Sequence, residues 1–295
     1  MIITRLQGGL GNQMFQYAIA KKLALLYNTK VVLDTTYLDT TYYDGNTIRK
    51  YSLGIFEFNS TRVSNNELYL FGIENDTFRP SLYYRFLKKN INPVIVKEKQ
   101  LNYDAEVFTK ANKYTYLDGY WQTEKYFSDI RDQLMLDFTV KKILEGDNLK
   151  FSKHIQAVNS VSIHIRRGDY LTSPIAYNTH GVCDIDYYNK AVDSIIEKIR
   201  NPILFVFSDE IAWAKENLKT PIDTFYVEHN NSEKAHEDLR LMSLCKHNII
   251  ANSSFSWWGA WLNANKSKIV ITPNKWFKTN KFNLVDIIPE KWIKL

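Results

Sequence analysis

Apolar and polar side chains alternate over residues 161–166, which is the pattern of a strand with one apolar face. The stretch 203–207 is apolar throughout and predicts a strand buried on both faces. Shorter apolar runs at 248–251 and 269–272 predict two more strands. Apolar residues recur at helical spacing between them, as at Tyr188, Ala191, Val192, Ile195, Ile196 and Ile199. Strands that alternate with helices predict a parallel, doubly wound α/β sheet.

The first residues follow the same order. An apolar strand at 2–6 leads into a glycine turn, a helix and a second strand at 31–34. Residues 37–120 have weak periodicity and are harder to assign, apart from a strand end predicted at 117–122. The charged, weakly periodic segment 141–153 predicts a domain boundary. We therefore expect two Rossmann-like domains, 1–150 and 151–295.

Composition limits the class of protein. The 295 residues are 45% hydrophobic and 24% charged, as in ordinary globular chains. No run approaches the ~20 apolar residues of a membrane span, and residues 1–6 lack the features of a signal peptide. The two cysteines, Cys183 and Cys245, are too few for a disulfide framework or a metal site, which favours the reducing cytoplasm. The net charge of +6 permits anionic partners, but the lysines are scattered among acidic residues, as on a solvated surface.

Polar groups stand at four strand ends, where α/β proteins bind ligands. The group at the end of the 161–166 pattern contains His164, Arg166, Arg167 and Asp169. Arginine is matched to phosphate because its guanidinium is planar, charged and able to bond bidentately. This group predicts a diphosphate clamp, and the alternative is an arginine pair in a surface ion-pair network.

Two of the other groups open helices. In the turn at 8–12, glycines let backbone N–H groups approach a ligand at a helix N-terminus, and the residues of interest are Gly9, Gly11 and Asn12. Its spacing fits neither a Walker loop nor a dinucleotide fingerprint, so a structural tight turn is the alternative. The stretch 252–256 supplies hydroxyls for a phosphate or a sugar, from Ser253, Ser254 and Ser256. Helix capping alone would explain Ser253. The tryptophans that follow, Trp257, Trp258 and Trp261, are expected to pack in the core or between domains, with stacking on a ligand as the alternative.

Carboxylates form the remaining candidates. Asp209 and Glu210 end the 203–207 strand and could bind a metal or a ribose diol, although capping of the next helix is the favoured single role. Asp238 begins a helix and could accept both N–H groups of guanine, again with capping as the alternative. No Asp-X-Asp stands in a suitable strand-end loop, so we predict no metal site.

Together these segments resemble the α-1,2-fucosyltransferases of glycosyltransferase family 11. The resemblance rests on residues 8–18, 164–170, 207–210 and 252–259, which occur in the family order from one end of the chain to the other. It implies a GT-B-type fold, with two doubly wound domains facing across a cleft. It also implies inverting transfer of L-fucose from GDP-fucose to a glycan hydroxyl, the 2-OH of a terminal galactose, without metal or other cofactor. Animal relatives carry an N-terminal membrane anchor, and its absence here implies a bacterial cytoplasmic member.

The resemblance also implies residue roles. Arg166 would bind the β-phosphate, with Arg167 and Asp169 in support, and His164 would approach the guanosine. Asp238 would recognise guanine, and Ser253, Ser254 and Ser256 would hold phosphates. Asn12, beside Gly9 and Gly11, would reach the fucose or its phosphate, and Asp209 would lie in the donor site. No general base is identified, and Asp34 and Glu228 are weak candidates.

Other functions stay open at this stage. Another nucleotide sugar could replace GDP-fucose, because a shared fold does not decide the donor. A single-stranded nucleic-acid binder would need basic and aromatic residues interleaved on one face, whereas the polar motifs here end strands, so no nucleic-acid partner is expected. The acceptor is expected to be a glycan or a lipid-linked oligosaccharide, which is compatible with peripheral association at an anionic membrane.

Overall fold

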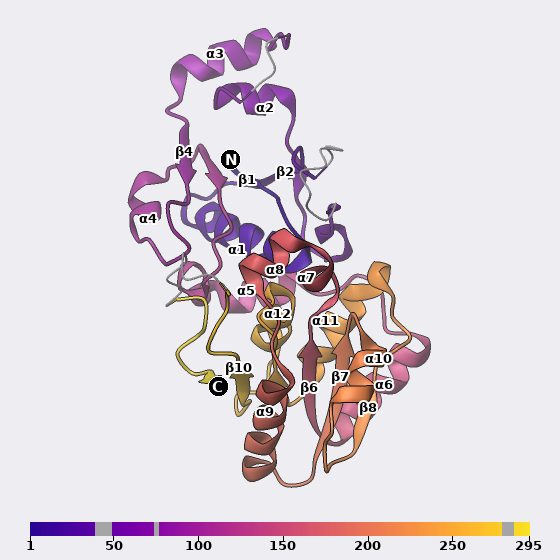
Figure 1. The fold of residues 1–295 in the computed structure, drawn as a ribbon. Coiled ribbons are helices and arrows are strands. Elements are labelled where there is room, and N and C mark those ends of the chain that lie inside the picture. Colours follow the sequence, from indigo (N-terminus) through magenta and orange to yellow (C-terminus); the bar gives the residue numbers. More distant parts are fainter. Residues whose placement is uncertain (39–48, 74–76, 279–285) are drawn as a thin grey trace. The chain divides into compact units, whose positions relative to one another are not determined.

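The computed structural model describes residues 1–38, 49–73, 77–278 and 286–295, which form two compact units (Figure 1). The N-terminal unit contains the described residues up to Thr139 together with Asp286 and Ile287. The C-terminal unit contains residues 140–278 and 288–295. The main division lies between Thr139 and Val140, ahead of the expected boundary at 150, which falls inside the helix α6 (Gly146–Ala157).

The N-terminal unit is built on a five-stranded sheet in the order β3-β2-β1-β5-β4, and every strand pair described in it is parallel. The strands are β1 (Ile2–Arg5), β2 (Val31–Asp34), β3 (Thr61–Arg62), β4 (Val94–Lys97) and β5 (Thr115–Asp118). The helices are α1 (Leu10–Leu26), α2 (Asn65–Leu70), α3 (Leu82–Asn90), α4 (Glu106–Lys110) and α5 (Arg131–Asp137). Most of these elements lie in residues 37–120, where the sequence pattern indicated only the strand end at 117–122, which is the end of β5.

The C-terminal unit has a six-stranded sheet in the order β11-β10-β9-β6-β7-β8, again with parallel pairs. Its strands are β6 (Asn159–Ile165), β7 (Pro202–Ser208), β8 (Thr224–Tyr226), β9 (His247–Ile249), β10 (Val270–Thr272) and β11 (Ile293–Lys294). After α6, its helices are α7 (Gly168–Thr172), α8 (Pro174–His180), α9 (Ile185–Lys198), α10 (Ile211–Asn217), α11 (Ala235–Leu244) and α12 (Ser254–Leu262). Two parallel α/β sheets confirm the predicted fold class.

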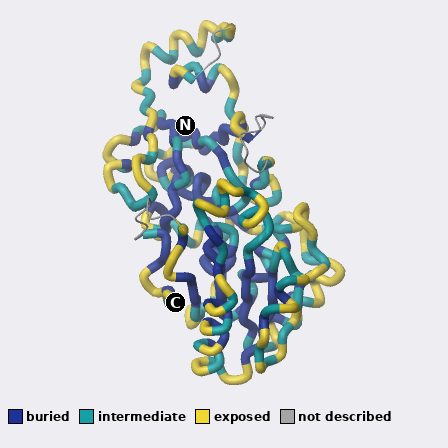
Figure 2. The backbone as a smooth tube through the Cα atoms, viewed as in Figure 1, coloured by how far each residue is buried: buried dark blue, intermediate teal, exposed yellow. Residues whose placement is uncertain are grey.

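Burial explains the sequence patterns (Figure 2). The apolar face of β6 is completely buried, and it packs with β7 and with the predicted apolar face of α9 in one core. Trp257, Trp258 and Trp261 are at most 2% exposed, which confirms that they pack in the core. The segment between β6 and Gly181 is helical. It contains α7 and then α8, which has Ser173 as its N-cap and Pro174 in its first turn.

The register of the second sheet gathers the polar motifs at one edge. Ile165 of β6 pairs with Ser208 of β7, and Ile163 pairs with Ile249 of β9. Because these three neighbouring strands are parallel, their carboxyl ends meet at the same edge. The residues that follow them, at 166–169, 209–210 and 252–254, therefore share that edge of the C-terminal unit.

Candidate active site

Arg166 is held between two carboxylates from successive strand ends. Its Nη2 lies 2.5 Å from Asp169 Oδ1, and its Nη1 lies 2.8 Å from Asp209 Oδ2. Gly168 makes this possible, because a Cβ at that position would stand 2.6 Å from Asp209 Oδ2. A guanidinium has five N–H donors, and these two ion pairs leave capacity for a ligand.

Arg167 belongs to the same cluster. Its backbone N–H donates to Asp209 Oδ1 at 2.9 Å, its Nε donates to Glu210 Oε2 at 3.1 Å, and its guanidinium lies 3.7 Å from the Trp213 ring centroid. Two guanidiniums therefore face three carboxylates, so the ion-pair network considered as the alternative is present. That network also fixes the orientation that a phosphate clamp requires, and the two interpretations are compatible. Both carboxylate oxygens of Asp209 contact the arginines, so its role is to position them.

His164 is buried on β6, with 5% of its surface exposed and its ring 5.6 Å from that of Phe255. Burial, with the nearby charge of Arg166, lowers its pKa to about 3, so its imidazole is neutral at physiological pH. Its Nδ1 has no hydrogen-bond partner among the described residues. A buried polar atom without a partner is costly, so this nitrogen is suited to a hydrogen bond with a ligand or an ordered water.

A ring stack missed by the sequence analysis adjoins the cluster. Arg166 lies over Tyr170 at 5.4 Å, and Tyr170 stacks on His180 at 4.8 Å. Tyr170 also donates from its hydroxyl to the Asn252 carbonyl at 3.3 Å, while the Asn252 side chain donates to the His180 carbonyl at 2.9 Å. Burial lowers the pKa of His180. Arg166 precedes α7 and Tyr170 lies within it, so no helical spacing rule could have indicated this contact.

The three serines at the start of α12 have different environments. Ser253 caps the helix, with its Oγ accepting from the Phe255 N–H at 3.3 Å. Ser256 is 1% exposed and donates to the Ser253 carbonyl at 3.3 Å. Ser254 is partly exposed at the first helical position, which has no acidic neighbour in its turn. Capping is therefore confirmed for Ser253, and Ser254 is the serine whose position best suits the predicted phosphate contact.

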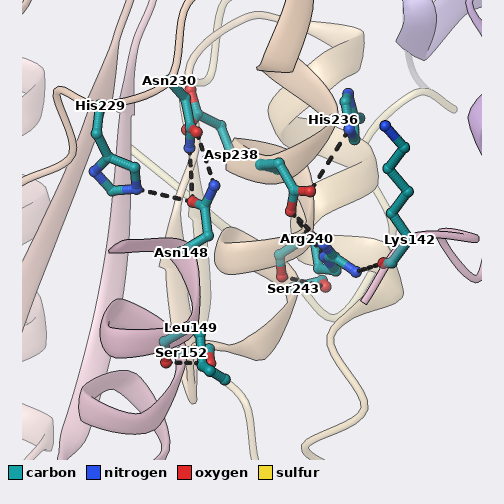
Figure 3. A network of polar contacts seen from close by, with 11 residues as sticks. Lys142, Asn148, Leu149, Ser152, His229, Asn230, His236, Asp238, Arg240 and Ser243 are labelled. Atoms are coloured by element: carbon teal, nitrogen blue, oxygen red, sulfur yellow. Dashed lines mark hydrogen bonds and ion pairs between the residues drawn. The ribbon is translucent and has the colours of Figure 1, made fainter. Parts of the chain in front are cut away.

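Asp238 lies in the first turn of α11 within a polar network (Figure 3). Its Oδ1 accepts from Asn230 Nδ2 at 2.7 Å, and the same amide donates to Asn148 Oδ1 at 2.9 Å. His229 Nε2 lies 2.8 Å from that Asn148 oxygen. Burial and the neighbouring Glu237 raise the pKa of Asp238 to about 7. This carboxyl is neither an N-cap nor ion-paired to Arg240, which binds Glu237 instead.

Asp238→Asn should shift the pH dependence of stability. The native pKa of about 7 lies above the unfolded value of ~3.9, so the folded chain holds this proton more tightly. The contribution to the free energy of unfolding is greatest at low pH and falls as pH rises between those values. Asparagine does not titrate. The free energy of unfolding of the variant minus that of wild type, measured with urea, should therefore increase between about pH 4 and pH 8. If the free energies of unfolding of the two proteins ran parallel as a function of pH, the raised pKa would be contradicted.

The glycine turn of the N-terminal unit holds Asn12 against the backbone. Gly8 has φ +75°, and a Cβ there would collide with Asn12 Nδ2. Asn12 Oδ1 accepts from Gln122 Nε2 at 2.8 Å. Gly9 is the N-cap of α1 and provides no side-chain cap, and the first turn, which includes Gly11, has no acidic residue. The positive end of this 17-residue helix is therefore not neutralised by a carboxylate of its own first turn.

Two glutamines that sequence reasoning passed over organise this turn. Gln13 is buried; its Nε2 donates to the carbonyls of Gly8 and Lys50, each at 2.9 Å. Gln16 is also buried; its Oε1 accepts from the Gln7 N–H at 3.0 Å, and its Nε2 donates to the Gly119 carbonyl at 3.2 Å. Polar residues inside an otherwise apolar helix were the available signal, because buried amides need backbone partners.

The candidate general bases are engaged elsewhere. Asp34 is 1% exposed and accepts from the Tyr116 hydroxyl at 2.6 Å and from the Thr36 hydroxyl at 2.7 Å. Glu228 pairs with Lys215 at 2.6 Å on the surface of the C-terminal unit. These structural partners account for the positions of both carboxylates. Among the residues that the structure describes, no group of three or more His, Cys, Asp or Glu side chains is placed to hold a metal ion.

These features define a class of protein. Two parallel α/β sheets, with arginines and a helix N-terminus at a strand-end edge, are the architecture of a GT-B-type glycosyltransferase. The model of the family described as "Glycosyl transferase family 11" matches residues 1–295. The chain belongs to glycosyltransferase family 11.

Two relatives match along the whole chain. An Escherichia coli alpha-1,2-colitosyltransferase is 34% identical over 302 residues, covering 100% of this chain and 99% of that protein. The Escherichia coli O-antigen biosynthesis glycosyltransferase WbnK is 36% identical over 305 residues, covering 98% and 99%. Galactoside alpha-(1,2)-fucosyltransferase 2 of Pongo pygmaeus is 27% identical over 156 residues, covering 51% of this chain and 46% of that one.

The fold also resembles that of a solved structure. The structure of Arabidopsis thaliana FUT1 in complex with GDP aligns with a TM-score of 0.54, covering 98% of this chain and 74% of that one, at 12% identity. At that identity the likeness supports the fold and carries no residue roles.

Proposed function

We propose that this family 11 glycosyltransferase transfers L-fucose from GDP-fucose to a hydroxyl of a glycan, the 2-OH of a terminal galactose. The observation that carries the proposal is the cluster around Arg166 at the carboxyl edge of the C-terminal sheet. It combines an oriented guanidinium with the buried, unpartnered Nδ1 of His164. A guanidinium suits a diphosphate, and a neutral imidazole suits hydrogen bonding to a nucleoside.

The proposed step is a single displacement at the anomeric carbon. The acceptor oxygen forms a bond to C1 of fucose while the bond between C1 and the β-phosphate oxygen breaks, and the electron pair leaves with GDP. The β-linked sugar of the donor becomes α-linked, so the configuration inverts. The acceptor proton passes to solvent or to a base that our candidates do not include. Arg166 stabilises the negative charge that develops on the departing diphosphate.

The two units would divide this work. The C-terminal unit would bind GDP through His164, Arg166 and Ser254, with Asp238 accepting from guanine. The N-terminal unit would serve the acceptor side, and Asn12 would contact the sugar or its phosphate. Asp209, Arg167 and Asp169 would keep Arg166 in position, as their hydrogen bonds and ion pairs suggest.

A second donor deserves comparison because one full-length relative is named as a colitosyltransferase. Colitose lacks one ring hydroxyl of fucose, so the same diphosphate clamp would accept either GDP-sugar. A site that hydrogen-bonds the additional hydroxyl of fucose would reject colitose strongly, whereas an apolar site would discriminate weakly.

The test is a donor and acceptor matrix. The purified chain would be incubated with GDP-fucose, GDP-colitose and a UDP-sugar, each with a panel of β-galactosides, and the new linkage would be mapped by NMR. We expect GDP-fucose to give the highest kcat/KM and an α-1,2 product. A preference for GDP-colitose would select the second donor, and transfer from only the UDP-sugar would overturn the proposal.

Asp238→Asn provides a separate test of guanine recognition. The ionised carboxylate is the form that accepts both guanine N–H groups, and it predominates above a pKa of about 7. The variant should bind GDP at least tenfold more weakly at about pH 8, since hydrogen bonds to charged groups contribute about 1.5–3 kcal/mol. The ratio of variant to wild-type Kd should shrink as pH falls to about 6. Ionisation of GDP itself affects both Kd values equally and therefore does not change this ratio. A ratio near one throughout would remove Asp238 from the donor site.

Turnover should survive removal of divalent metal. Arg166 and the N-terminus of α12 can stabilise a diphosphate without one, so rates in EDTA should stay within about twofold of the untreated enzyme. The control is a parallel assay with added Mg²⁺ or Mn²⁺. A complete loss in EDTA that Mg²⁺ or Mn²⁺ restores would move Asp209 and Glu210 from positioning the arginines to binding a metal.

A further inference from the structure

Helix α3 of the N-terminal unit exposes large apolar side chains. Leu82 is 80% exposed, Phe86 69% and Tyr83 65%. Leu82 and Phe86 are four residues apart and Tyr83 and Phe86 three apart, so the three lie on one face. Figure 2 colours most of this helix as exposed. Three large apolar side chains on one short helix form a patch that usually marks an interaction surface.

The opposite face explains why the helix keeps this orientation. Tyr84, Leu87 and Ile91 pack against the core cluster that includes Leu68 and Phe71. Lys88 donates to the Tyr69 carbonyl at 2.7 Å and lies 4.1 Å from the Tyr69 ring centroid. Figure 1 shows α3 lying beside α2. The exposed apolar face is therefore fixed outward by packing on the other side.

The chain segment that carries the patch is basic, and the acidic Glu67 of α2 acts on Tyr84, on the opposite face of α3. Residues 77–97 contain five basic residues and no acidic one: Arg79, Arg85, Lys88, Lys89 and Lys97. This stretch departs from the scattered, acid-interleaved lysines expected for the chain as a whole. Arg85 and Lys89 are exposed and four residues apart, and each is three residues from a member of the Leu82–Phe86 row. A basic row therefore runs along the apolar one.

We propose that the exposed face of α3 docks the protein on an anionic lipid surface. An apolar row flanked by cations is the pattern of a helix lying in a membrane interface, where rings enter the acyl boundary and cations meet acidic headgroups. Peripheral contact is the relevant mode, because none of the helices in the described ranges has the length and apolarity of a membrane span. The docking depends on α3 alone and not on the identity of the donor sugar.

Co-sedimentation with vesicles tests this docking, in the absence of donor and acceptor. Wild-type chain should bind vesicles of mixed phosphatidylglycerol and phosphatidylcholine and release in high salt, and should bind pure phosphatidylcholine poorly. Leu82→Ser combined with Phe86→Ser should lower the partition coefficient at least about tenfold. Arg85→Glu combined with Lys89→Glu should lower it at least about thirtyfold on anionic vesicles, given about 1 kcal/mol per basic residue lost.

The matched control removes two exposed apolar side chains elsewhere. Leu136 is 68% exposed and Ile143 77%, and Leu136→Ser with Ile143→Ser should leave vesicle binding unchanged. Thermal unfolding of each variant checks that the fold is intact. Failure of the wild-type chain to bind anionic vesicles would overturn the proposal, as would equal binding by the Leu82→Ser, Phe86→Ser variant. Loss of a dimer in that variant, without wild-type vesicle binding, would assign the face to a second copy instead.

Discussion

Replacing Arg166 with alanine should reduce kcat by about 10²–10³, corresponding to about 3–4 kcal/mol of lost transition-state stabilisation. The guanidinium is fixed by Asp169 at 2.5 Å and by Asp209 at 2.8 Å, so its remaining donors need little reorganisation to meet charge on the diphosphate. Arg166→Lys should restore little of this, because one ammonium cannot bridge both carboxylates and also present a fork to phosphate.

The control for Arg166 is Arg200→Ala in the same unit. Arg200 is exposed and lies between α9 and β7, at the amino end of the sheet and thus at the edge opposite the cluster. The Arg200→Ala substitution removes the same charge from the chain as Arg166→Ala. It should leave kcat within about twofold of wild type, as expected for an exposed surface position. Steady-state kinetics with GDP-fucose, alongside far-UV circular dichroism, would compare the two. Near-native turnover in a folded Arg166→Ala variant would show that the arginine pair serves the ion-pair network alone.

Four of the six strands described in the C-terminal sheet, β6, β7, β9 and β10, were predictable because they have strong, short-range patterns, whereas β8 and β11 were not predicted. Alternation over 161–166 and the apolar run at 203–207 became the central parallel pair β6 and β7, with the polar motifs at their carboxyl ends. Much of the N-terminal unit was not predictable. β3 has only two residues, and both are exposed. β4 alternates between inner and exposed positions, but its exposed Ile95 is apolar, so the sequence itself shows no alternation there.

Site residues could be proposed from the sequence, but their mutual contacts could not. Asp209 was expected in the donor site, yet both of its oxygens contact the two arginines, because the register places Ser208 opposite Ile165. The Tyr170–His180 stack depends on the packing of α7 against α8. Such contacts arise from tertiary geometry, which residue type and spacing do not encode.

Within the glycine turn, Asn12→Ala should lower kcat by about a hundredfold, as for loss of one preorganised hydrogen-bond donor. GDP affinity should change far less, because Asn12 is expected to contact the sugar or the bond being broken, and GDP lacks the sugar. The Asn12 oxygen is occupied by Gln122, so the Nδ2 group is the part of the amide available to donate. Calorimetric GDP affinity and turnover would be measured on the same preparation.

Gln122→Met separates a contact with the donor from a structural role of Asn12. This variant removes the 2.8 Å hydrogen bond to Asn12 Oδ1 but keeps the Asn12 amide and much of the volume of Gln122. If Asn12 only held the turn together, both variants would slow turnover equally, and GDP binding would fall with it. If Asn12 acts on the sugar, Asn12→Ala should be much the slower enzyme. Unchanged turnover in Asn12→Ala would make the turn structural, since Gly8 could then serve only to admit the Asn12 amide against the backbone.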